Sequence, residues 1–233
     1  MDDKIIKQIL DINCHFYESY AKEFSVTRQA PWLGWSQLLT FLSTNKMRVL
    51  DLGCGNGRFY KFLKCNLKNE FDYQGVDISK NLVKEAINNF PNVNFITQDF
   101  LLKNNDYVDD FDIIVGFGIM HHIVGGVLRM RLISNLSEYL IDGGVLVLTF
   151  WIQEPSAEKI KTGMGHTLEK NDYLVKWNND KNKFRYVHVF DKNELEKIKG
   201  EVTRFGLELI NEFLSDGKNG NSNVYLVWRL KRG

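Results

Sequence analysis

The spacing of apolar residues changes along the chain, and each spacing predicts a different element. Near the N-terminus apolar residues recur at helical intervals and predict a helix over 3–24. Pro31 interrupts this pattern, and the segment WLGWSQLLTFL predicts a second helix over 32–42. These two helices form a predicted N-terminal cap over 1–44.

Short apolar runs then alternate with amphipathic segments. The predicted strands cover 47–53, 71–77, 92–99, 111–118 and 143–150. The predicted helices between them cover 57–67, 80–88 and 127–140. Alternating strands and helices predict an α/β fold: a Rossmann-like, doubly wound, mostly parallel sheet with helices on both faces.

The alternation of predicted strands and helices stops after Phe150. Asp191 suits the first position of a helix, and Glu194 completes a capping box. Two apolar runs, 207–215 and 223–230, flank DGKNGNS, which predicts a hairpin and an antiparallel last strand. The polar region 153–183 is interpreted as an insertion or lid. We therefore expect one domain over 1–233, with a substrate region over 151–188.

Composition narrows the class of protein. The chain has 233 residues and a net charge of +1, so no global field draws it to nucleic acid or membrane. Its three cysteines are scattered, which favours a reducing compartment, and no His/Cys/Asp spacing predicts a metal site. No run approaches the roughly 20 apolar residues of a membrane span. We expect a cytoplasmic protein without a membrane partner.

The segment VLDLGCGNGRF carries the first candidate chemistry. A dinucleotide motif that started at Gly53 would need glycine where Arg58 stands, and the lysine of a phosphate loop is missing. The pattern is instead Asp51, Gly53, Gly55, Gly57. The glycines allow a ligand to approach the backbone, the following helix suits a carboxylate, and Asp51 suits an ammonium. S-adenosylmethionine has both groups; the alternative is a tight turn without a ligand.

Two more acids end predicted strands. Asp77 can accept the ribose hydroxyls, with Ile78 on the adenine, and Asp99 can accept from the adenine amino group beside Phe100. A single acid at a strand end is more often a helix cap or a turn former. Three at successive strand ends predict a ligand crevice, because such crevices lie at that edge of the sheet.

Residues 45–150 therefore resemble the class I S-adenosylmethionine-dependent methyltransferases. The resemblance implies a seven-stranded sheet with an antiparallel last strand. It also implies cofactor contacts from Tyr17, as a lid, and from Gly116.

Further segments occur in one order over nearly the whole chain: FYESYAKEFSVTRQAPW, GIMHHI, TFWIQEPS, DYLVKW, RYVHVFDKNELEKI and NSNVYLVW. Together they resemble the eukaryotic tRNA methyltransferases that esterify 5-carboxymethyluridine at the wobble position. The resemblance implies tRNA as a partner, together with a small zinc-containing activator subunit. The chain departs from the family pattern at Lys176 and Val224.

Methylation of a carboxylate needs no strong base, because the oxygen is already anionic at pH 7. The acceptor pocket should instead hold hydrogen-bond donors and cations. By the resemblance, the catalytic candidates are Arg28, His121, His122 and His188, and the substrate-binding candidates are Trp32, Lys176, Arg185 and Asn223. Each histidine also fits a structural role.

Two other functions stay open. One is a small-molecule O- or N-methyltransferase on the same fold, since fold does not determine substrate. The other is a scaffold that binds the cofactor and activates a partner without catalysis.

Overall fold

The computed structural model describes residues 3–42, 46–101, 111–155, 169–177 and 180–232. Its strands are β1 (Met47–Leu52), β2 (Phe71–Asp77), β3 (Asn94–Thr97), β4 (Phe111–Gly116), β5 (Leu140–Trp151), β6 (Asp172–Trp177), β7 (Asp180–His188), β8 (Leu207–Ser215) and β9 (Asn223–Leu230). Its α-helices are α1 (Asp3–Ser19), α2 (Ala21–Thr27), α3 (Trp35–Leu38), α4 (Arg58–Asn66), α5 (Lys80–Asn89), α6 (Gly126–Glu138) and α7 (Lys192–Glu201). Three 3₁₀ turns complete it: η1 (Leu39–Phe41), η2 (Met120–His122) and η3 (Val202–Phe205).

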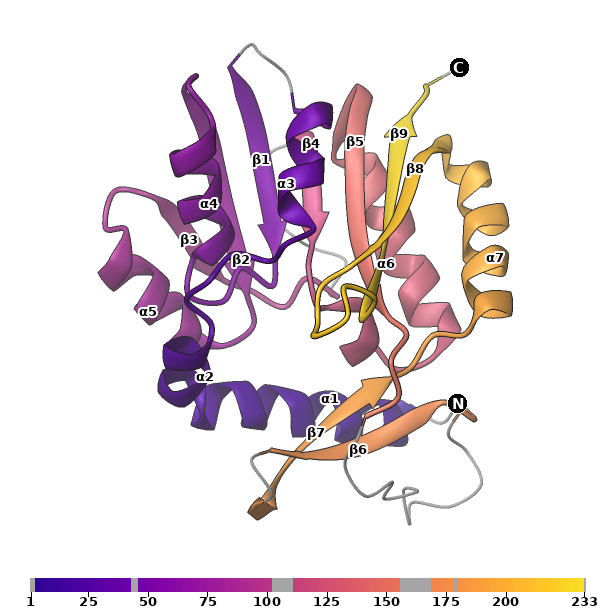
Figure 1. Cartoon of the computed structure of the whole chain (residues 1–233). Helices are drawn as coiled ribbons and strands as arrows, with labels where there is room; N and C mark the ends of the chain where they lie inside the picture. The colour runs from indigo at the N-terminus through magenta and orange to yellow at the C-terminus, as the bar shows by residue number, and fades with distance from the viewer. Residues whose placement is uncertain (1–2, 43–45, 102–110, 156–168, 178–179, 233) are drawn as a thin grey trace.

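The main sheet has seven strands in the order β3-β2-β1-β4-β5-β9-β8 (Figure 1). Strands β1 to β5 pair in parallel, and β9 runs antiparallel to both β5 and β8. The predicted fold class is therefore confirmed, including the antiparallel last strand. Residue Asp51 lies opposite Gly75 on one side and Val115 on the other, which places it in the middle of the sheet.

Apolar side chains fill both faces of this sheet. Leu50, Leu146 and Trp228 pack on one face with residues of α6 and α7. The alternate residues Val49 and Val147 pack on the other face with residues of α3, α4 and α5. Strand side chains alternate between faces, so the near-continuous apolar runs in β1 and β5 reflect burial on both sides.

The N-terminal helices differ from the prediction. The helix expected over 3–24 is broken at Tyr20 into α1 and α2, and the helix expected over 32–42 is reduced to α3 and η1. Tyr20 packs against Phe16 with ring centroids 5.4 Å apart, and the Lys183 ammonium lies 4.3 Å from the Tyr20 ring centroid. Tyr20, where the helix is interrupted, is thus in contact with β7, and helical periodicity does not report such tertiary contacts.

The region predicted to be an insertion or lid contains an antiparallel pair, β6 and β7, on either side of residues 178–179. Residues 156–168 of that region lie outside the described residues. Strand β7 contacts α1 and η2, and α1 also contacts α5. In Figure 1, α1 and the β6–β7 pair lie beyond the carboxyl ends of the parallel strands, next to the predicted crevice. The proposed division into a cap and a substrate region stays a prediction.

Candidate functional site

The glycine-rich turn after β1 adopts a backbone that suits glycine. Gly53, Gly55 and Gly57 have φ angles of +69°, +54° and +80°, in the left-handed region. The amide of Gly53 donates to the Val76 carbonyl at 2.7 Å, which ties the turn to β2. Gly57 then precedes the first turn of α4. The turn thus leads directly from a buried strand to a helix N-terminus.

A cavity of about 310 Å³ lies beside this turn. It brings together fourteen of the predicted site residues: Tyr17, Arg28, Trp32, Asp51, Gly53, Gly55, Asp77, Ile78, Asp99, Phe100, His121, His122, Arg185 and Asn223. The cavity residues come from α1 and α2, from the ends of β1 to β4, from η2, from β7 and from β9. The carboxyl ends of parallel strands meet at one edge of a sheet, which is why residues distant in sequence converge here.

The three predicted acids differ in their partners. Asp51 is 2% exposed and accepts a hydrogen bond from the Tyr73 hydroxyl. Asp77 accepts from the amides of Gly55 and Ser79, both at 2.9 Å. Asp99 accepts from the amide of Leu101 at 2.9 Å. Asp77 therefore holds the glycine turn in place as well as facing the cavity.

Burial changes the acidity of two of these groups. Desolvation raises the pKa of Asp51 to about 7, although the hydrogen bond from Tyr73 opposes the shift. Desolvation likewise raises the pKa of Asp77 to about 6, against the hydrogen bonds from backbone amides. An incoming ammonium group would compensate the cost of ionising Asp51.

The cavity fits S-adenosylmethionine. A Cβ added at Gly55 would meet no protein atom within 4 Å, so the glycine leaves open space along the cavity wall. Asp51 and Asp77 supply buried acceptors for an ammonium and for ribose hydroxyls. The volume lies near the lower end of the roughly 300–1,000 Å³ of small-ligand sites. When bound, S-adenosylmethionine supplies an electrophilic methyl group.

Cofactor affinity should therefore depend on pH through Asp51. As the pH falls through about 7, Asp51 takes up a proton that ammonium binding must remove, so the dissociation constant for S-adenosylmethionine should rise. We expect about a tenfold rise between pH 8 and pH 6. Isothermal titration calorimetry would measure it, and an equal pH dependence in Asp51→Asn would contradict this assignment.

The same shift predicts how the ligand-free protein responds to pH. Between 3.8 and about 7 the folded state holds a proton on Asp51 that the unfolded state has lost. The contribution of Asp51 to the free energy of unfolding therefore decreases as the pH rises through this window.

Part of the cavity wall is cationic and aromatic. The Arg28 guanidinium lies 5.0 Å from the Phe24 ring centroid and 5.3 Å from that of Trp177. Arg185 also lies 5.3 Å from the Trp177 centroid. Desolvation lowers the pKa of Arg28, and repulsion from Arg185 lowers it further. The two cations thus face the same space.

Arg58 adds a third cation to this wall. Its guanidinium lies 5.7 Å from the Trp32 ring centroid and 5.2 Å from that of Trp35, and it donates to the Ala30 carbonyl at 2.9 Å. Desolvation lowers its pKa to about 10, and repulsion from Arg28 adds to the shift. Among the residues that the structure describes, Arg28, Arg58 and Arg185 form no ion pair with a carboxylate. Such a wall suits an anion.

A chain of hydrogen bonds joins Arg185, Tyr17 and His122 at the cavity. Arg185 donates to the Tyr17 hydroxyl at 3.3 Å, and this hydroxyl lies 2.7 Å from Nε2 of His122. Nδ1 of His122 donates to the Tyr186 carbonyl at 2.8 Å, so Nε2 is the acceptor of the tyrosine proton. Desolvation and the charge of Arg185 lower the pKa of His122 to about 3. His122 is therefore a neutral acceptor that orients Tyr17.

The neighbouring histidine has a different environment. Nδ1 of His121 is buried and has no hydrogen-bond partner in the described structure. Its ring lies against Trp151, with centroids 5.2 Å apart. Desolvation and repulsion from His122 lower the pKa of His121 well below its usual range. An unpartnered imidazole nitrogen at the cavity is suited to a hydrogen bond with a bound ligand.

Four predicted site residues do not line the cavity. Gly57 and Gly116 lie next to residues packed around the cavity instead. Gly116 is in close contact with the side chain of Ile119, and Gly57 with those of Phe90 and Phe95. Lys176 lies on β6, and His188 lines a different depression on the far side of β7. The structure therefore separates His188 from the other catalytic candidates.

Sequence reasoning also missed cavity residues. Asn56, inside the glycine motif, donates to the Arg28 carbonyl at 3.2 Å and to the Ser25 hydroxyl at 3.0 Å, and so ties the turn to α2. Trp151 and Ser222 also line the cavity. The position of Asn56 between two glycines was a signal, but its partners on α2 are tertiary contacts.

Asn13 on α1 is another residue that periodicity did not single out. It is 7% exposed; its side-chain oxygen accepts from the Tyr186 amide at 2.7 Å, and its amide donates to the carbonyls of Tyr186 and His122. It therefore fastens α1 to both β7 and η2.

Replacement of Asn13 with alanine should lower the free energy of unfolding by about 2–4 kcal/mol, because it leaves buried backbone groups unpaired. The higher helix propensity of alanine offsets only a small part of this loss. Chemical denaturation would measure the change. Asn66→Ala, which removes a bond to the Phe62 carbonyl four residues back on α4, is the matched control; equal losses in both variants would contradict the clamp.

Comparison with known proteins places the chain in a family. The sequence model of the methyltransferase domain family matches residues 43–200. The chain is 29% identical over 185 residues to a protein of Encephalitozoon cuniculi that is named only as a methyltransferase, covering 78% of this chain and 82% of that protein.

Two relatives carry names that refer to tRNA. The human protein named probable tRNA methyltransferase 9B is 30% identical over 167 residues, which cover 70% of this chain and 32% of the human protein. The Arabidopsis thaliana tRNA (carboxymethyluridine(34)-5-O)-methyltransferase is 28% identical over 147 residues, which cover 63% of this chain and 34% of that protein. The chain thus spans about a third of the length of these two relatives.

Among solved structures, a S-adenosylmethionine-dependent methyltransferase from Methanosarcina mazei superimposes with a TM-score of 0.68 at 16% identity, over 84% of this chain and 98% of that one. No helix among the described residues is long and apolar enough to cross a membrane. The predicted cofactor, S-adenosylmethionine, is confirmed by the family and by this shared fold. The chain therefore belongs to the methyltransferase domain family and has the fold of S-adenosylmethionine-dependent methyltransferases.

Proposed function

We propose that this methyltransferase transfers a methyl group to the carboxylate of 5-carboxymethyluridine at the tRNA wobble position and forms the methyl ester. The observation that carries the proposal is the cationic wall of Arg28, Arg58 and Arg185, which lines the same cavity as Asp51 and Asp77. Desolvation, with a smaller contribution from repulsion between guanidiniums, lowers the pKa of Arg28 and Arg58, so a bound anion would stabilise their charged forms. The names of the human and Arabidopsis relatives support tRNA as the bearer of that anion.

The residues of the chain can hold and aim a carboxylate without a general base. Arg28 and Arg185 supply donors with positive charge, and each guanidinium lies 5.3 Å from the ring centroid of Trp177, which limits its movement. His122 is neutral and already accepts from Tyr17, so it orients Tyr17 and removes no proton. Since an ionised carboxylate is already nucleophilic, alignment and removal of water are what the pocket must provide.

Recognition of a nucleotide needs a surface for the base. Trp32 lines the cavity beneath the Arg58 guanidinium, and Trp151 lines it beside His121. Base stacking on such rings is tolerant of sequence and is typical of extruded nucleotides. Lys183 on β7 pairs with Glu23 at 3.2 Å, which partly neutralises the charge it could offer to RNA. The zinc-containing activator subunit remains a prediction of the resemblance.

The test uses S-adenosylmethionine labelled in the methyl group and tRNA from cells that lack the wobble carboxyl methyltransferase, with and without a candidate activator. Nucleoside mass spectrometry should locate the label in the methyl ester of carboxymethyluridine, and mild base should remove it. No transfer to tRNA, despite cofactor binding and the activator, would overturn the proposal. Transfer to a member of a metabolite panel would then identify a small-molecule O- or N-methyltransferase, and no transfer to any acceptor would identify a scaffold.

A further inference from the structure

A second group of charged side chains lies outside the cavity, where α6, α7 and the start of β6 meet the end of β7. We call it the His188 cluster; its members are Arg129, Glu169, Asp172, His188 and Glu194. His188 and Arg129 are each 1% exposed, and Asp172 is also buried. Charges at such depth persist only when they are paired.

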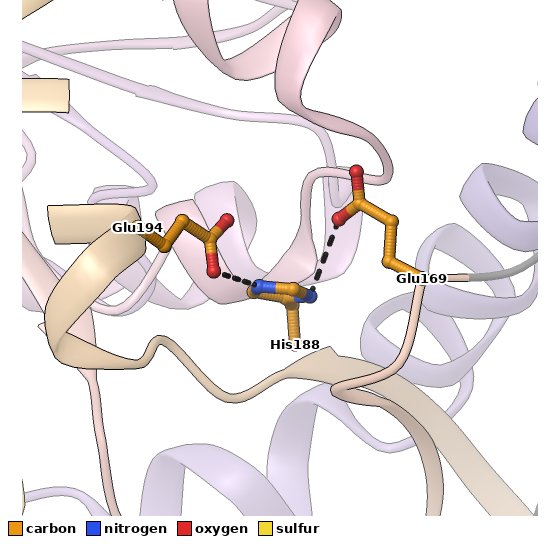
Figure 2. A group of neighbouring side chains, drawn as sticks. All are labelled: Glu169, His188 and Glu194. Atoms are coloured by element: carbon orange, nitrogen blue, oxygen red, sulfur yellow. Dashed lines mark hydrogen bonds and ion pairs between the residues drawn. The ribbon is translucent and has the colours of Figure 1, made fainter. Parts of the chain in front are cut away.

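Both nitrogens of the His188 ring face carboxylates. Nδ1 lies 2.6 Å from Asp172 and 3.6 Å from Glu169, and Nε2 lies 2.8 Å from Glu194. Figure 2 shows the ring between Glu169 and Glu194. Two carboxylates at hydrogen-bond distance each require a donor, so both nitrogens carry protons and the ring is an imidazolium.

Arg129 supplies a second cation, so two cations face the three carboxylates of the cluster. One terminal nitrogen of its guanidinium donates to Glu169 at 2.9 Å and to Glu194 at 2.8 Å, and Nε donates to the Ile123 carbonyl at 3.0 Å. Glu169, His188 and Glu194 are close enough together to ligate a metal ion. However, the guanidinium and the imidazolium already occupy these groups. The arrangement therefore favours an ion-pair network over a metal centre.

The cluster is connected to the cavity through β7 and η2. The Tyr186 hydroxyl donates to Asp172 at 2.6 Å, and the Tyr186 carbonyl accepts from His122. Arg185, which faces the cavity, is the preceding residue. Ile123, which accepts from Arg129, directly follows His122. Arg185 and His122, which line the cavity, are thus the immediate chain neighbours of Tyr186 and Ile123, which are bonded to the cluster.

We propose that His188 is a positioning residue: as an imidazolium it fixes β7 to β6 and α7, so that Arg185 holds an anionic acceptor while His122 keeps Tyr17 in place. Acceptor affinity then falls when His188 loses its proton. The inference rests on the proposed function only for the identity of the acceptor. Its consequence is that acceptor binding and cofactor binding have different pH dependences.

The direction follows from every charged group that faces His188. Asp172 on β6, Glu169 before β6 and Glu194 on α7 favour the proton, while Arg129 on α6 opposes it. Tyr186 on β7 shares Asp172, and the charge of His188 also acts on His121 of η2. Burial lowers the pKa of His188, but the hydrogen bonds to Asp172 and Glu194 outweigh it, and the pKa is raised. The stabilisation is complete below the usual 6.5 and is lost as the pH rises through the raised value.

The experiment compares the wild-type chain with His188→Gln and Glu194→Gln. Glu196→Gln, on the same helix but in a surface pair with Lys199, is the matched control. Histidine NMR gives the pKa of His188, with His15→Gln, an exposed histidine of α1, as a control for assignment. The buried Nε–H of Arg185, which has no hydrogen-bond partner in the described structure, reports the position of β7.

We expect His188 to titrate above 6.5 in the wild type and at lower pH in Glu194→Gln. In the wild type, the chemical shift of the Arg185 Nε–H should change with pH at the same midpoint as His188. In His188→Gln this pH-dependent change should be absent. With tRNA bearing 5-carboxymethyluridine, the KM for tRNA should rise about 3- to 30-fold across the step, within the range of coupling through packed networks. The dissociation constant for S-adenosylmethionine should not rise across this step, because the dependence on Asp51 makes it fall as the pH rises.

A His188 pKa at or below 6.5, or an unchanged Arg185 step in His188→Gln, would overturn the inference. A KM profile of His188→Gln that matches the wild type would do the same. If His188→Gln does not fold, Glu194→Gln supplies the shifted midpoint. If the wild type transfers no methyl group to tRNA, the proposed function fails, and the two NMR measurements still decide the role of His188.

Discussion

Replacement of Gly53 with alanine is expected to weaken S-adenosylmethionine binding by about 100-fold. Gly53 has a φ of +69°, and a Cβ there would lie 2.4 Å from Cγ2 of Ile119. Ile119 is itself buried and packs over Gly116, so it has little room to move. The left-handed backbone costs a non-glycine residue about 1–2 kcal/mol, and the overpacked contact costs about 1–3 kcal/mol. The turn should shift to relieve the backbone strain and the close contact with Ile119, and the shifted turn should bind the cofactor less tightly.

Calorimetry would measure the affinity, and two matched glycines separate the causes. Gly200→Ala, in α7, meets no atom within 4 Å and should bind the cofactor normally. Gly55→Ala meets no protein atom either, but has a φ of +54° and borders the cavity, so its loss of affinity reports backbone strain and contact with the ligand. Wild-type affinity in Gly53→Ala would show that the turn is not the cofactor site.

Replacement of Arg185 with glutamine should lower kcat/KM for the carboxylate acceptor by about 100- to 1,000-fold. Arg185 faces the cavity beside Arg28, donates to Tyr17 and lies against Trp177, so its loss removes a charge and also releases the Tyr17 hydroxyl. Removal of one partner from a desolvated charge pair costs about 2–5 kcal/mol. The cofactor acids have other partners, so the dissociation constant for S-adenosylmethionine should change little.

Methyl transfer to tRNA, with separate determination of kcat and KM, would test this prediction. Arg204→Gln is the matched control, because its guanidinium stacks on Phe205 at 4.8 Å and lies outside the cavity. A drop of the same size in both variants would indicate a general loss of basic charge. A fall in cofactor affinity equal to the fall in kcat/KM would place Arg185 in the cofactor site instead.

The fold and the convergence of Asp51, Asp77 and the glycine-rich turn on one cavity were predictable because they depend on local signals. Apolar runs and amphipathic segments reflect burial on two faces. Asp51, Asp77 and Asp99 lie at or just beyond the carboxyl ends of strands, and these ends meet in any parallel sheet. The glycines of the turn likewise reflect backbone angles that are set within a few residues.

The acceptor side was less predictable because strand alternation separates residues that look alike in sequence. Arg185 and His188 were both assigned to the acceptor pocket, yet residues three apart on a strand point to opposite faces. Tyr186 and His188 share a face, and both reach the same oxygen of Asp172, whereas Arg185 faces the cavity. The sequence of the 153–183 region predicted an insertion or lid and did not show that β7 is a strand. Without the strand, the alternation of faces could not be used to separate Arg185 from His188.

The sequence by itself determined the parallel sheet, the antiparallel end and the cofactor turn, because each depends on period, glycine and acid within short segments. Only the tertiary structure decided which cations face the ligand, that His122 is a neutral acceptor and that His188 belongs to a separate buried cluster. These properties depend on desolvation and on partners far along the chain: Asn13, 173 residues away from Tyr186, holds β7 in place. Burial and long-range pairing arise only when the chain has folded, and they determine the charge of each of these groups.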